Sequence, residues 1–319
     1  MSPFVIASQL DEDFNEVIRQ RLAQSHPQAR VIGVPAGVPS DLPAEVGILL
    51  ARPINVRGYQ APDTPPPGWP YGLQWIQVVS SGIDFYPKWL FNGPPVSTSR
   101  GSAAENIAEF ALAAIFAAAK RLPDIWVHDA QWHFTALTPL KGTTLGILGF
   151  GAIGRSLAAK AHALGIKVLA LRESQTPFDV EGVEAARDIH ELFSRSDHLV
   201  LAAPLTEATR HIVDSTVLAS AKPGLHLINI ARGGLLDHGA LLEALDNGSL
   251  GLASLDVTEP EPLPDGHPLY SHPRVRLSPH TSAISSNSRH EIADSFLTNL
   301  ERFLNGLALE NQADVQRGY

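Results

Sequence analysis

The sequence predicts an α/β protein with two domains, each built on a doubly wound parallel sheet that helices cover. Short apolar segments alternate with helical patterns between residues 143 and 280, and this alternation is typical of a parallel sheet with helices on both faces. The first hundred residues hold further apolar runs separated by proline and glycine, as short buried strands are. A chain of 319 residues also exceeds the usual size of one hydrophobic core.

The apolar segments locate the expected strands. In the alternating region these segments are 144–149, 167–171, 198–203, 226–231 and 252–257, with helical patterns at 155–165 and 238–248. Earlier in the chain, 46–53 and 73–82 are expected strands. The segment 61–70 is expected to be an irregular loop, because its five prolines lack backbone donors. We expect one continuous domain over residues 99–287 and a discontinuous domain from 1–98 and 288–319, with a ligand between them.

Two longer helical patterns flank the alternating region. Residues 102–122 form a pattern that is apolar around most of its circumference, with Ser102 as a candidate N-cap and Glu105 as its capping-box partner. A helix of this kind is buried either in the core of its own domain or in a dimer interface, and both interpretations stay open. Residues 287–306 form an amphipathic helix that we expect to end at Gly306.

Composition and charge exclude several classes of protein. The chain has 44% hydrophobic and 18% charged residues and no cysteine, so it has no disulfide, zinc–thiolate site or catalytic thiol. A net charge of −9 without basic runs is unlike a nucleic-acid-binding protein. No apolar stretch reaches the roughly 18 residues of a membrane span, and the N-terminus lacks a secretory signal, so we expect a cytoplasmic protein.

A glycine motif follows the strand at 144–149. Gly149, Gly151 and Gly154 form GxGxxG between an apolar strand and a helical pattern, which is the context that a dinucleotide site requires. The first glycine permits the turn, the second permits close approach of a pyrophosphate, and the third permits close packing of helix on strand. The pattern predicts a Rossmann-like dinucleotide-binding domain over 99–287, and another Rossmann-like nucleotide site, as in a methyltransferase, is the alternative.

The end of the next strand bears on which dinucleotide binds. NAD-binding domains usually carry an acidic residue there that binds the ribose 2′-hydroxyl. This chain instead has Arg172, 23 residues after Gly149, and a guanidinium attracts a 2′-phosphate. Ser174 could add a hydrogen bond. We therefore expect NADP(H) to be favoured over NAD(H), with Glu173 as the residue that would favour NAD(H) if it faced the ribose instead.

Polar residues follow three later strands at the edge where parallel sheets bind ligands. Arg232 follows the expected strand 226–231. Asp256 lies at the end of the expected strand 252–257 and Glu261 follows it, while His280 follows the segment VRLSP. A 2-keto acid reductase needs a permanent cation for the substrate, a proton donor for the carbonyl oxygen, and a carboxylate that holds that donor. Arg232, His280 and Glu261 supply these groups. Each residue also has an interpretation without a function: Arg232 as a surface arginine, His280 as a loop histidine bonded to the backbone, and Glu261 as a solvated carboxylate in a turn.

With these residues in order, the chain resembles the D-isomer-specific 2-hydroxyacid dehydrogenases, a family that includes glyoxylate/hydroxypyruvate reductases and phosphoglycerate dehydrogenases. The resemblance covers about residues 100–300 and rests on LGILGFGAIGRSLA, APLTEATRHIV, NIARGGLLD, LDVTEPEPLPDGHPL and SPHTSA. The first hundred residues match only through QVVSSGID, and the proline-rich loop at 61–70 has no counterpart.

The resemblance implies a role for each residue that matches a family motif. It makes Arg232 the substrate-orienting arginine, His280 the acid/base and Glu261 the carboxylate paired with it, with Glu259 at the wrong offset. Ser81 and Gly82 would bind the substrate carboxylate through backbone N–H groups, together with Arg232 and His280. Implied cofactor contacts are Gly149, Gly151, Ala152, Ile153, Gly154, Arg172, Ser174, Pro204, Ile230, Ala231, Asp256 (to the nicotinamide carboxamide), His280 and Ala283.

The resemblance also implies a reaction and an assembly. We expect reduction of a small 2-keto acid to the D-2-hydroxy acid by a homodimer formed through the nucleotide-binding domain, with no metal, nucleic acid or membrane partner. NAD-dependent members carry Asp at the position of Arg172, which again favours NADP(H). The identity of the keto acid stays open. A dinucleotide-sensing regulatory protein that uses the same fold without catalysis is the alternative.

Overall fold

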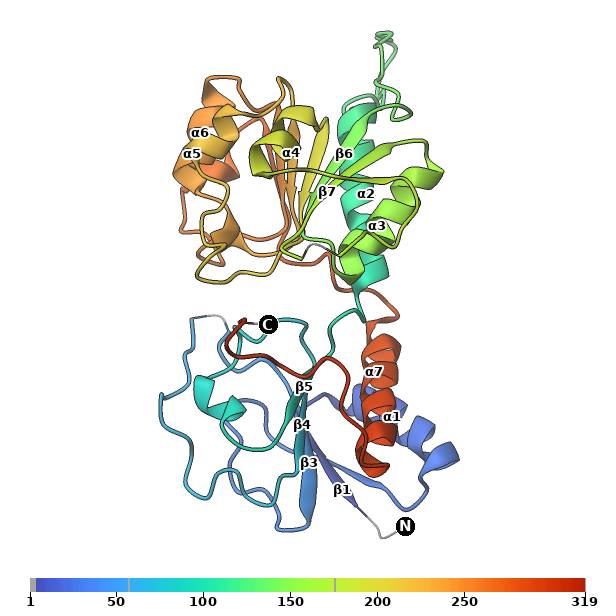
Figure 1. Ribbon diagram of the computed structural model, residues 1–319, viewed down its shortest axis with the longest axis vertical. Coiled ribbons are helices and arrows are strands. Elements are labelled where there is room, and N and C mark those ends of the chain that lie inside the picture. Colours follow the sequence, from blue (N-terminus) through green and yellow to red (C-terminus); the bar gives the residue numbers. More distant parts are fainter. Residues whose placement is uncertain (1–3, 57, 175, 319) are drawn as a thin grey trace. The chain divides into compact units, whose positions relative to one another are not determined.

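The computed structural model describes residues 4–56, 58–174 and 176–318. The chain divides into two compact units, one formed by Met1–Ala103 with Ser285–Tyr319 and the other by Ala104–Ile284. The boundaries between the units, at 103/104 and 284/285, fall a few residues from the expected domain boundaries at 98/99 and 287/288. We refer to the discontinuous unit as the first unit and to the continuous one as the second unit (Figure 1).

The second unit is built on a seven-stranded sheet in the order β12-β11-β10-β9-β6-β7-β8, in which every pair is parallel. The chain starts in the middle of the sheet, proceeds to one edge and then returns to fill the other, as doubly wound sheets do. The strands are β6 (Thr144–Leu148), β7 (Lys167–Leu171), β8 (Val183–Ala185), β9 (His198–Leu201), β10 (His226–Asn229), β11 (Leu252–Leu255) and β12 (Val275–Leu277). The predicted α/β class with parallel sheets is confirmed.

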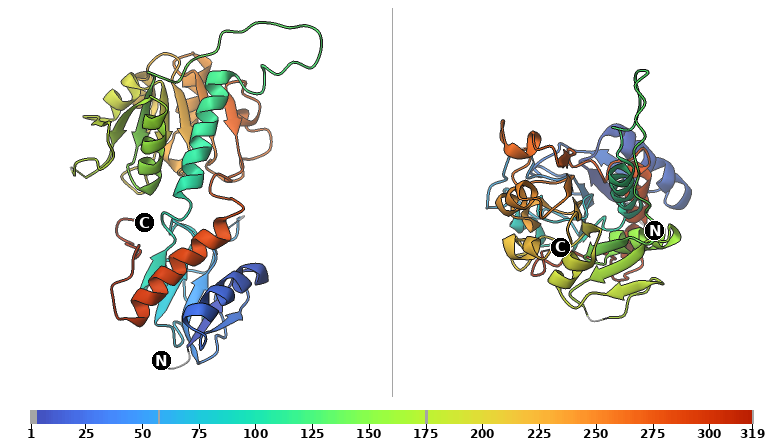
Figure 2. Two further views of the ribbon diagram at one scale, coloured as in Figure 1. Left: turned by 90° about the vertical axis from the view of Figure 1, so that its right-hand side faces the viewer. Right: turned by 90° about the horizontal axis from the view of Figure 1, so that it is seen from above.

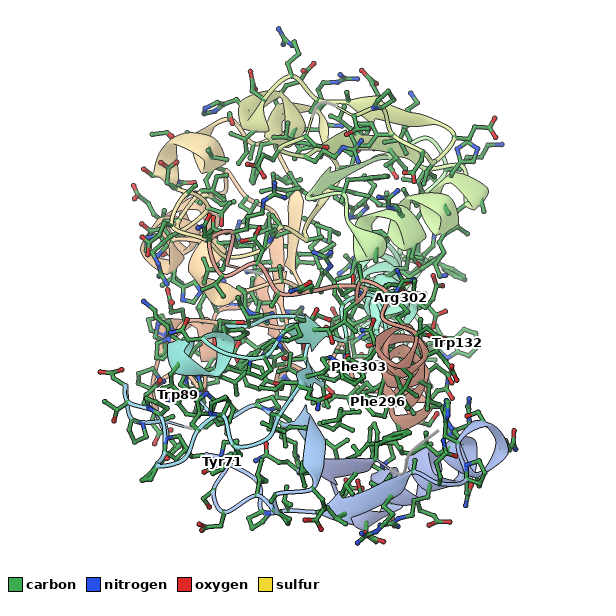
Figure 3. The ribbon with its side chains drawn as sticks, turned by 60° about the horizontal axis from the view of Figure 1, so that its bottom comes forward. Tyr71, Trp89, Trp132, Phe296, Arg302 and Phe303 are labelled. Atoms are coloured by element: carbon green, nitrogen blue, oxygen red, sulfur yellow. The ribbon has the colours of Figure 1, made fainter. Side chains whose placement is uncertain are left out.

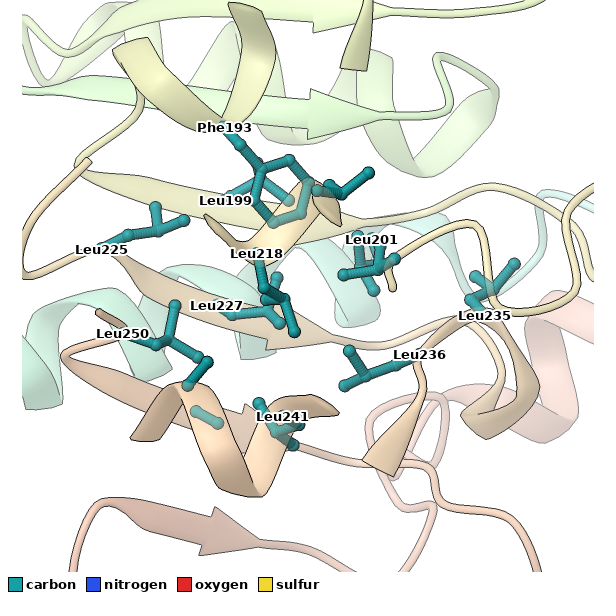
Figure 4. Close-up of a cluster of buried hydrophobic side chains, with 14 of the residues drawn as sticks. Phe193, Leu199, Leu201, Leu218, Leu225, Leu227, Leu235, Leu236, Leu241 and Leu250 are labelled. Carbon is teal, nitrogen blue, oxygen red and sulfur yellow. The ribbon is translucent and has the colours of Figure 1, made fainter. Parts of the chain in front are cut away.

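Helices cover both faces of this sheet. Figure 1 shows α2 and α3 on one side, with α5 and α6 on the other. Phe193 of α4, Leu218 of α5 and Leu241 of α6 pack with leucines of β9 and β10 into one buried cluster (Figure 4). The helices are α2 (Ala104–Lys120), α3 (Ala152–Ala163), α4 (Ile189–Arg195), α5 (Ser215–Ala219) and α6 (His238–Asp246), with short 3₁₀ turns η2 (Gly233–Leu235) and η3 (Pro268–Tyr270).

The expected cap of α2 is wrong. The hydroxyl of Ser102 donates to the carbonyl oxygen of Ser99 at 2.8 Å, and the helix begins two residues later, at Ala104. Glu105 pairs with Lys160 of α3 instead of reaching back to the helix start. The capping pattern failed here because the side chain of Ser102 satisfies a preceding turn rather than the helix.

The first unit has a parallel five-stranded sheet in the order β2-β1-β3-β4-β5. In this order too, the chain starts inside the sheet, proceeds to one edge and then returns to fill the other. The strands are β1 (Val5–Ser8), β2 (Arg30–Gly33), β3 (Val46–Ala51), β4 (Trp75–Val78) and β5 (Val96–Thr98), and the helices are α1 (Glu12–Ser25), η1 (Lys88–Phe91) and α7 (Ser288–Leu304). The proline-rich segment 61–70 is a loop between β3 and β4, as expected.

The last helix completes the core of the first unit. Trp75 of β4 is fully buried and stacks on Phe296 and Phe303, with ring centroids 5.3 and 5.5 Å apart. Figure 3 shows both phenylalanines on α7. The side-chain amide of Asn299, also on α7, hydrogen-bonds Gln77 Oε1 at 3.2 Å within the same interior. Residues more than two hundred positions apart therefore form one core. Among the residues described, no helix has the length and apolar character to span a membrane.

Candidate active site

The predicted residues of the second unit follow the carboxyl ends of β6, β7, β9, β10, β11 and β12. They lie in the loops there, except for Ala152, Ile153 and Gly154, which form the first turn of α3. All of these strands are parallel, so their carboxyl ends meet at one edge of the sheet. The strand order reverses between β6 and β9, and ligands of open α/β sheets bind at such a switch point.

Three glycines lie at this switch point, in the turn after β6 and the first turn of α3. Gly149 has a φ of +96°, and a methyl group there would lie 2.5 Å from the backbone nitrogen of Ala203, after β9. A methyl group on Gly154 would lie 2.7 Å from the carbonyl oxygen of Gly149. Gly149 and Gly154 are therefore required by the fold itself. By contrast, a methyl group on Gly151 would meet nothing within 4 Å.

The open space at Gly151 suits a phosphate. Gly151 is the N-cap of α3, and no side chain caps the helix there, so no side chain accepts from the first N–H groups of the helix. Ala152 next to it is exposed, and the helix dipole favours an anion at this position. The residues present therefore fit the pyrophosphate of a dinucleotide, and packing within the protein does not require a glycine at position 151.

Arg172 lies directly after β7, as predicted. Its guanidinium stacks on the ring of Phe178, with Cζ 4.7 Å from the centroid, and Nη2 donates to the carbonyl oxygens of Thr176 and Pro177. Phe178 in turn packs edge-to-face on Phe150 of the glycine loop. Nε of Arg172 is buried and has no hydrogen-bond partner within the described structure. The arginine is therefore held beside the glycine loop, with one buried donor unsatisfied.

His280 and Glu261 are in direct contact. His280 Nδ1 lies 2.9 Å from Glu261 Oε2, and both side chains are about one-third exposed. The other carboxylate oxygen of Glu261 accepts the backbone N–H of Thr258 at 3.0 Å, which holds the carboxylate in place. Because Nδ1 faces a carboxylate, the ring orientation of His280 is set.

Asp256 was expected at the ligand-binding edge of the sheet, but its side chain is buried there, with only 2% of the residue exposed. Its Oδ1 accepts from the Ser278 hydroxyl at 2.6 Å and from the Thr281 N–H at 2.9 Å, and its Oδ2 accepts from the Ser282 N–H at 2.9 Å. Burial raises the pKa of Asp256, but these hydrogen bonds outweigh it and hold the pKa below its usual value. The ionised carboxylate therefore anchors the loop that carries His280.

Arg232 is positioned by a buried neighbour. Asn229, at the end of β10, is fully buried; its Oδ1 accepts the Ala231 N–H at 3.1 Å, and its Nδ2 donates to the Arg232 carbonyl oxygen at 2.8 Å. The Arg232 guanidinium donates to the carbonyl oxygen of Ala231 at 2.8 Å. The next residue, Gly233, packs so closely on the backbone of Thr258 that no side chain fits there. The loop with Arg232 thus rests on the loop with Glu261.

The other predicted residues are divided between the second unit and the first unit. Ile230 is buried and Pro204 is exposed beside β9, while Ala283 follows the His280 turn and Ser174 hydrogen-bonds Thr176 at 3.1 Å. Ser81 and Gly82 belong to the first unit.

Ser81 and Gly82 follow the carboxyl end of β4, which ends at Val78 and not at residue 82 as expected. The preceding Ser80 hydroxyl donates to the Gly82 carbonyl oxygen at 2.7 Å, which tightens the turn. Within the described part of the chain, the backbone N–H groups of Ser81 and Gly82 have no acceptor, so they are available to an anion.

Two supporting residues escaped the sequence analysis. Asn106 of α2 donates from Nδ2 to the Ser282 carbonyl oxygen at 2.6 Å, and so ties the helix to the His280 loop. A half-buried amide inside an otherwise apolar helix was the available signal. Ser278, which bonds Asp256, had no distinguishing signal. No group of three or more metal-ligating side chains occurs among the described residues.

Comparisons with known proteins identify the family of the chain. Residues 112–282 match the family model described as D-isomer specific 2-hydroxyacid dehydrogenase, NAD binding domain. A glycerate dehydrogenase from Methylorubrum extorquens is 33% identical over 248 residues, covering 73% of this chain and 77% of that protein. A glyoxylate reductase from Thermofilum pendens is 32% identical over 247 residues, covering 73% of each chain.

A solved structure is similar over the whole length. The D-isomer specific 2-hydroxyacid dehydrogenase from Xanthobacter autotrophicus Py2, in complex with NADPH and MES, has a TM-score of 0.81 at 27% identity and covers 100% of both chains. The chain therefore belongs to the D-isomer specific 2-hydroxyacid dehydrogenases. It is an oxidoreductase of the class that transfers hydride between a nicotinamide dinucleotide and a 2-hydroxy or 2-keto acid.

Proposed function

We propose that the protein reduces a small 2-keto acid to the D-2-hydroxy acid, with NADPH preferred over NADH and with Arg232, Glu261 and His280 as catalytic residues. The observation that carries this proposal is the contact of 2.9 Å between His280 Nδ1 and Glu261 Oε2. A histidine held in this way at the carboxyl edge of a dinucleotide-binding sheet is suited to move a proton at a carbonyl oxygen.

Each catalytic residue has one task in the proposed reaction. When bound, the reduced nicotinamide supplies a hydride to the keto carbon. The substrate oxygen gains negative charge, and His280 in its protonated form delivers a proton to it from Nε2. Glu261, at Nδ1, holds the ring in place and stabilises its positive charge before the transfer. Arg232 orients the substrate with a permanent cation, which matters in a chain of net charge −9. Ser81 and Gly82 are the proposed partners of the substrate carboxylate.

The relatives named above support this substrate class, because they include a glycerate dehydrogenase and a glyoxylate reductase. Loss of absorbance of the reduced nicotinamide should be followed with NADPH and NADH against glyoxylate, hydroxypyruvate and phenylpyruvate. We expect turnover of at least one small keto acid and its loss in His280→Ala, with coenzyme binding retained. Binding of coenzyme without turnover of any of these acids would contradict the proposal and support the non-catalytic alternative.

The preference for NADPH is proposed from Arg172. Its guanidinium is fixed by Phe178 and by two backbone carbonyl groups at the end of β7, where a carboxylate would repel a 2′-phosphate. In Arg172→Asp, the ratio of kcat/KM with NADPH to kcat/KM with NADH should fall. Arg187→Met is the matched control, because Arg187 is an exposed arginine of the same unit that pairs with Glu191. An unchanged ratio in Arg172→Asp would contradict the preference.

We also propose that two copies associate through the second unit. α2 borders a hollow of about 500 Å³, lined by Phe110, Ala114 and Ala117 of the helix and by Leu255 and Leu277 of the sheet.

The segment after α2 has the chemistry to fill such a hollow on a second copy. Figure 2 shows it extending away from the second unit, and Trp126, Trp132 and Phe134 in it are 60%, 70% and 101% exposed. Exposed apolar surface of this kind marks an association site. Light scattering after size exclusion should show a dimer, and Trp132→Ser combined with Phe134→Ser should shift it towards the monomer. A monomeric parent chain would contradict the proposal.

A further inference from the structure

Glu259, two residues before Glu261, makes a two-pronged ion pair. Its Oε2 accepts from Arg210 Nη1 at 2.7 Å and its Oε1 accepts from Arg210 Nη2 at 3.0 Å. The Arg210 hydrogen bonds lower the pKa of Glu259, burial opposes them, and the nearby His211 and His238 lower it further. Glu259 is therefore a stable carboxylate in a fixed geometry, because a bidentate arginine restrains both partners.

This ion pair lies where three strand-end loops meet. Arg210 belongs to the loop after β9, and Glu259 to the loop after β11. The third loop follows β10: a methyl group on Gly234 would lie 3.0 Å from Glu259 Oε2, so the carboxylate rests directly on that glycine. The backbone of the β9 loop also reaches the β10 loop, since His211 N–H donates to the Gly234 carbonyl oxygen at 2.8 Å.

The residues joined in this way adjoin the proposed catalytic groups. Gly233 directly follows Arg232, and Glu259 precedes Glu261 by two residues. The Arg232 loop and the Glu261 loop are in backbone contact at Gly233, so a shift of either loop would move both catalytic side chains. Glu261 in turn sets the orientation of His280 through the 2.9 Å contact.

We propose that Arg210 and Glu259 are positioning residues for the reaction, in that their ion pair fixes the distance between Arg232 and the Glu261–His280 pair. The inference rests on the proposed catalytic roles of those residues. Neither Arg210 nor Glu259 touches the reacting atoms in this role. Their effect is on the geometry of the loops, and a displacement of about 1 Å at a catalytic group lowers rates by up to about a hundredfold.

A second ion pair of the same shape provides a matched control. Arg195 donates to Glu184 at 2.7 and 2.8 Å, with similar exposure of both side chains, but it joins α4 to the edge strand β8. Exposed ion pairs contribute little to stability, so removing either pair should change the melting temperature only slightly. The two pairs should differ in their effect on catalysis.

The kinetic test compares Glu259→Gln, Arg210→Met and the double variant with the control Glu184→Gln. We expect each of the two single variants to lower kcat about tenfold or more, and the double variant to be no worse than either, because one interaction is lost in all three. The dissociation constant for the coenzyme should stay within about twofold of the parent value, as it should in the control. Arg210→Lys, which keeps the charge, should recover part of kcat.

A second measurement does not depend on turnover. Hydrogen exchange of the whole protein should become faster in residues 230–236 and 256–262 in Glu259→Gln but not in Glu184→Gln. Equal kcat in Glu259→Gln and the control, additive losses in the double variant, or unchanged exchange in both segments would each overturn the inference. If the parent protein reduces none of the keto acids, the proposed function fails, and the exchange experiment still decides whether the ion pair fixes the loops.

Discussion

His280 Nδ1 lies 2.9 Å from Glu261 Oε2, although the two residues come from loops after different strands. His280 has a φ of +51°, in the left-handed region that a non-glycine residue adopts only when its surroundings impose it. Its backbone N–H donates to the Asp256 carbonyl oxygen at 2.8 Å, and the two residues after it are bonded to the Asp256 carboxylate. The contact with Glu261 is therefore imposed by the loop as well as by the charge.

Glu261→Gln should lower kcat for keto-acid reduction by about a hundredfold, the order of effect expected when acid–base catalysis is impaired. The amide keeps the shape of the side chain but removes the negative charge that supports a protonated imidazole. Steady-state kinetics of this variant should be compared with Glu243→Gln, a change of the same type on the exposed side of α6. Equal kcat values in the two variants would rule out a catalytic role for the carboxylate.

Gly151→Ala should separate coenzyme binding from folding. The added methyl group meets no protein atom within 4 Å, so the melting temperature should stay close to that of the parent protein. The same group would occupy the space proposed for the pyrophosphate, and the dissociation constant for NADPH should rise tenfold or more, on the order of 1.4 kcal/mol.

Gly154→Ala is the contrasting variant for this experiment. Its methyl group would approach the Gly149 carbonyl oxygen to 2.7 Å, so it should lower the melting temperature as well. Coenzyme affinity can be followed by nicotinamide fluorescence and stability by thermal unfolding. Unchanged NADPH affinity in Gly151→Ala would show that the phosphate does not bind at this helix terminus.

Asp256→Asn should destabilise the His280 loop. The carboxylate accepts three hydrogen bonds in a buried position, and an amide would present a donor to at least one of the N–H groups of Thr281 and Ser282. Leaving such a buried group unsatisfied costs about 1–3 kcal/mol of unfolding free energy. Urea unfolding should show this loss, together with a lower kcat.

Ser278→Ala provides the graded comparison. It removes only the hydroxyl that donates to Asp256 at 2.6 Å and leaves the carboxylate with its two backbone donors. We expect a smaller loss of both stability and kcat than in Asp256→Asn. A larger loss in Ser278→Ala would place the anchor of the loop at the serine and not at the carboxylate.

His226 should make the stability of the protein depend on pH. It is buried at the start of β10, with Nε2 2.9 Å from Ser254 Oγ and Nδ1 3.3 Å from His198 Nδ1. Burial, with a contribution from His198, lowers the pKa of His226 from 6.5 to about 3. The unfolded chain then binds a proton that the folded chain does not, so the free energy of unfolding should fall as the pH drops from 6.5 towards 3, by at most about 1.4 kcal/mol per pH unit.

His226→Gln tests this dependence, because glutamine can hydrogen-bond but does not titrate in this range. Its melting temperature should fall less steeply than that of the parent protein between pH 6.5 and 4. His190→Gln, on the exposed side of α4, is the matched control. Identical slopes in the parent protein and in His226→Gln would show that this histidine does not contribute.

The sequence predicted the second unit well where burial determines the pattern. The expected strands at 144–149, 167–171, 198–203, 226–231 and 252–257 match β6, β7, β9, β10 and β11 to within two residues at each end, because central parallel strands are continuous apolar runs. The strands β8 and β12 were not predicted. Each has three residues and lies at an edge of the sheet, where exposed polar side chains interrupt the apolar run.

Side-chain partners in the loops were harder to foresee. The family motifs pointed to Glu261 as the partner of His280, and the two side chains do meet. Nothing in the local pattern indicated that Asp256 turns inward or that Glu259 pairs with Arg210, 49 residues away in the chain. Periodicity determines which face of a strand or helix is buried, but it does not determine the direction of a side chain in an irregular loop.

The division of the chain has a consequence for the order in which a ribosome-bound chain can fold. The second unit is complete once residue 284 has emerged, whereas the first unit still lacks α7, whose Phe296 and Phe303 cover Trp75. Domains generally fold as units during synthesis. The amino-terminal hundred residues, although made first, therefore reach their native core last, and a chain truncated before residue 285 would contain a complete second unit and an unfinished first one.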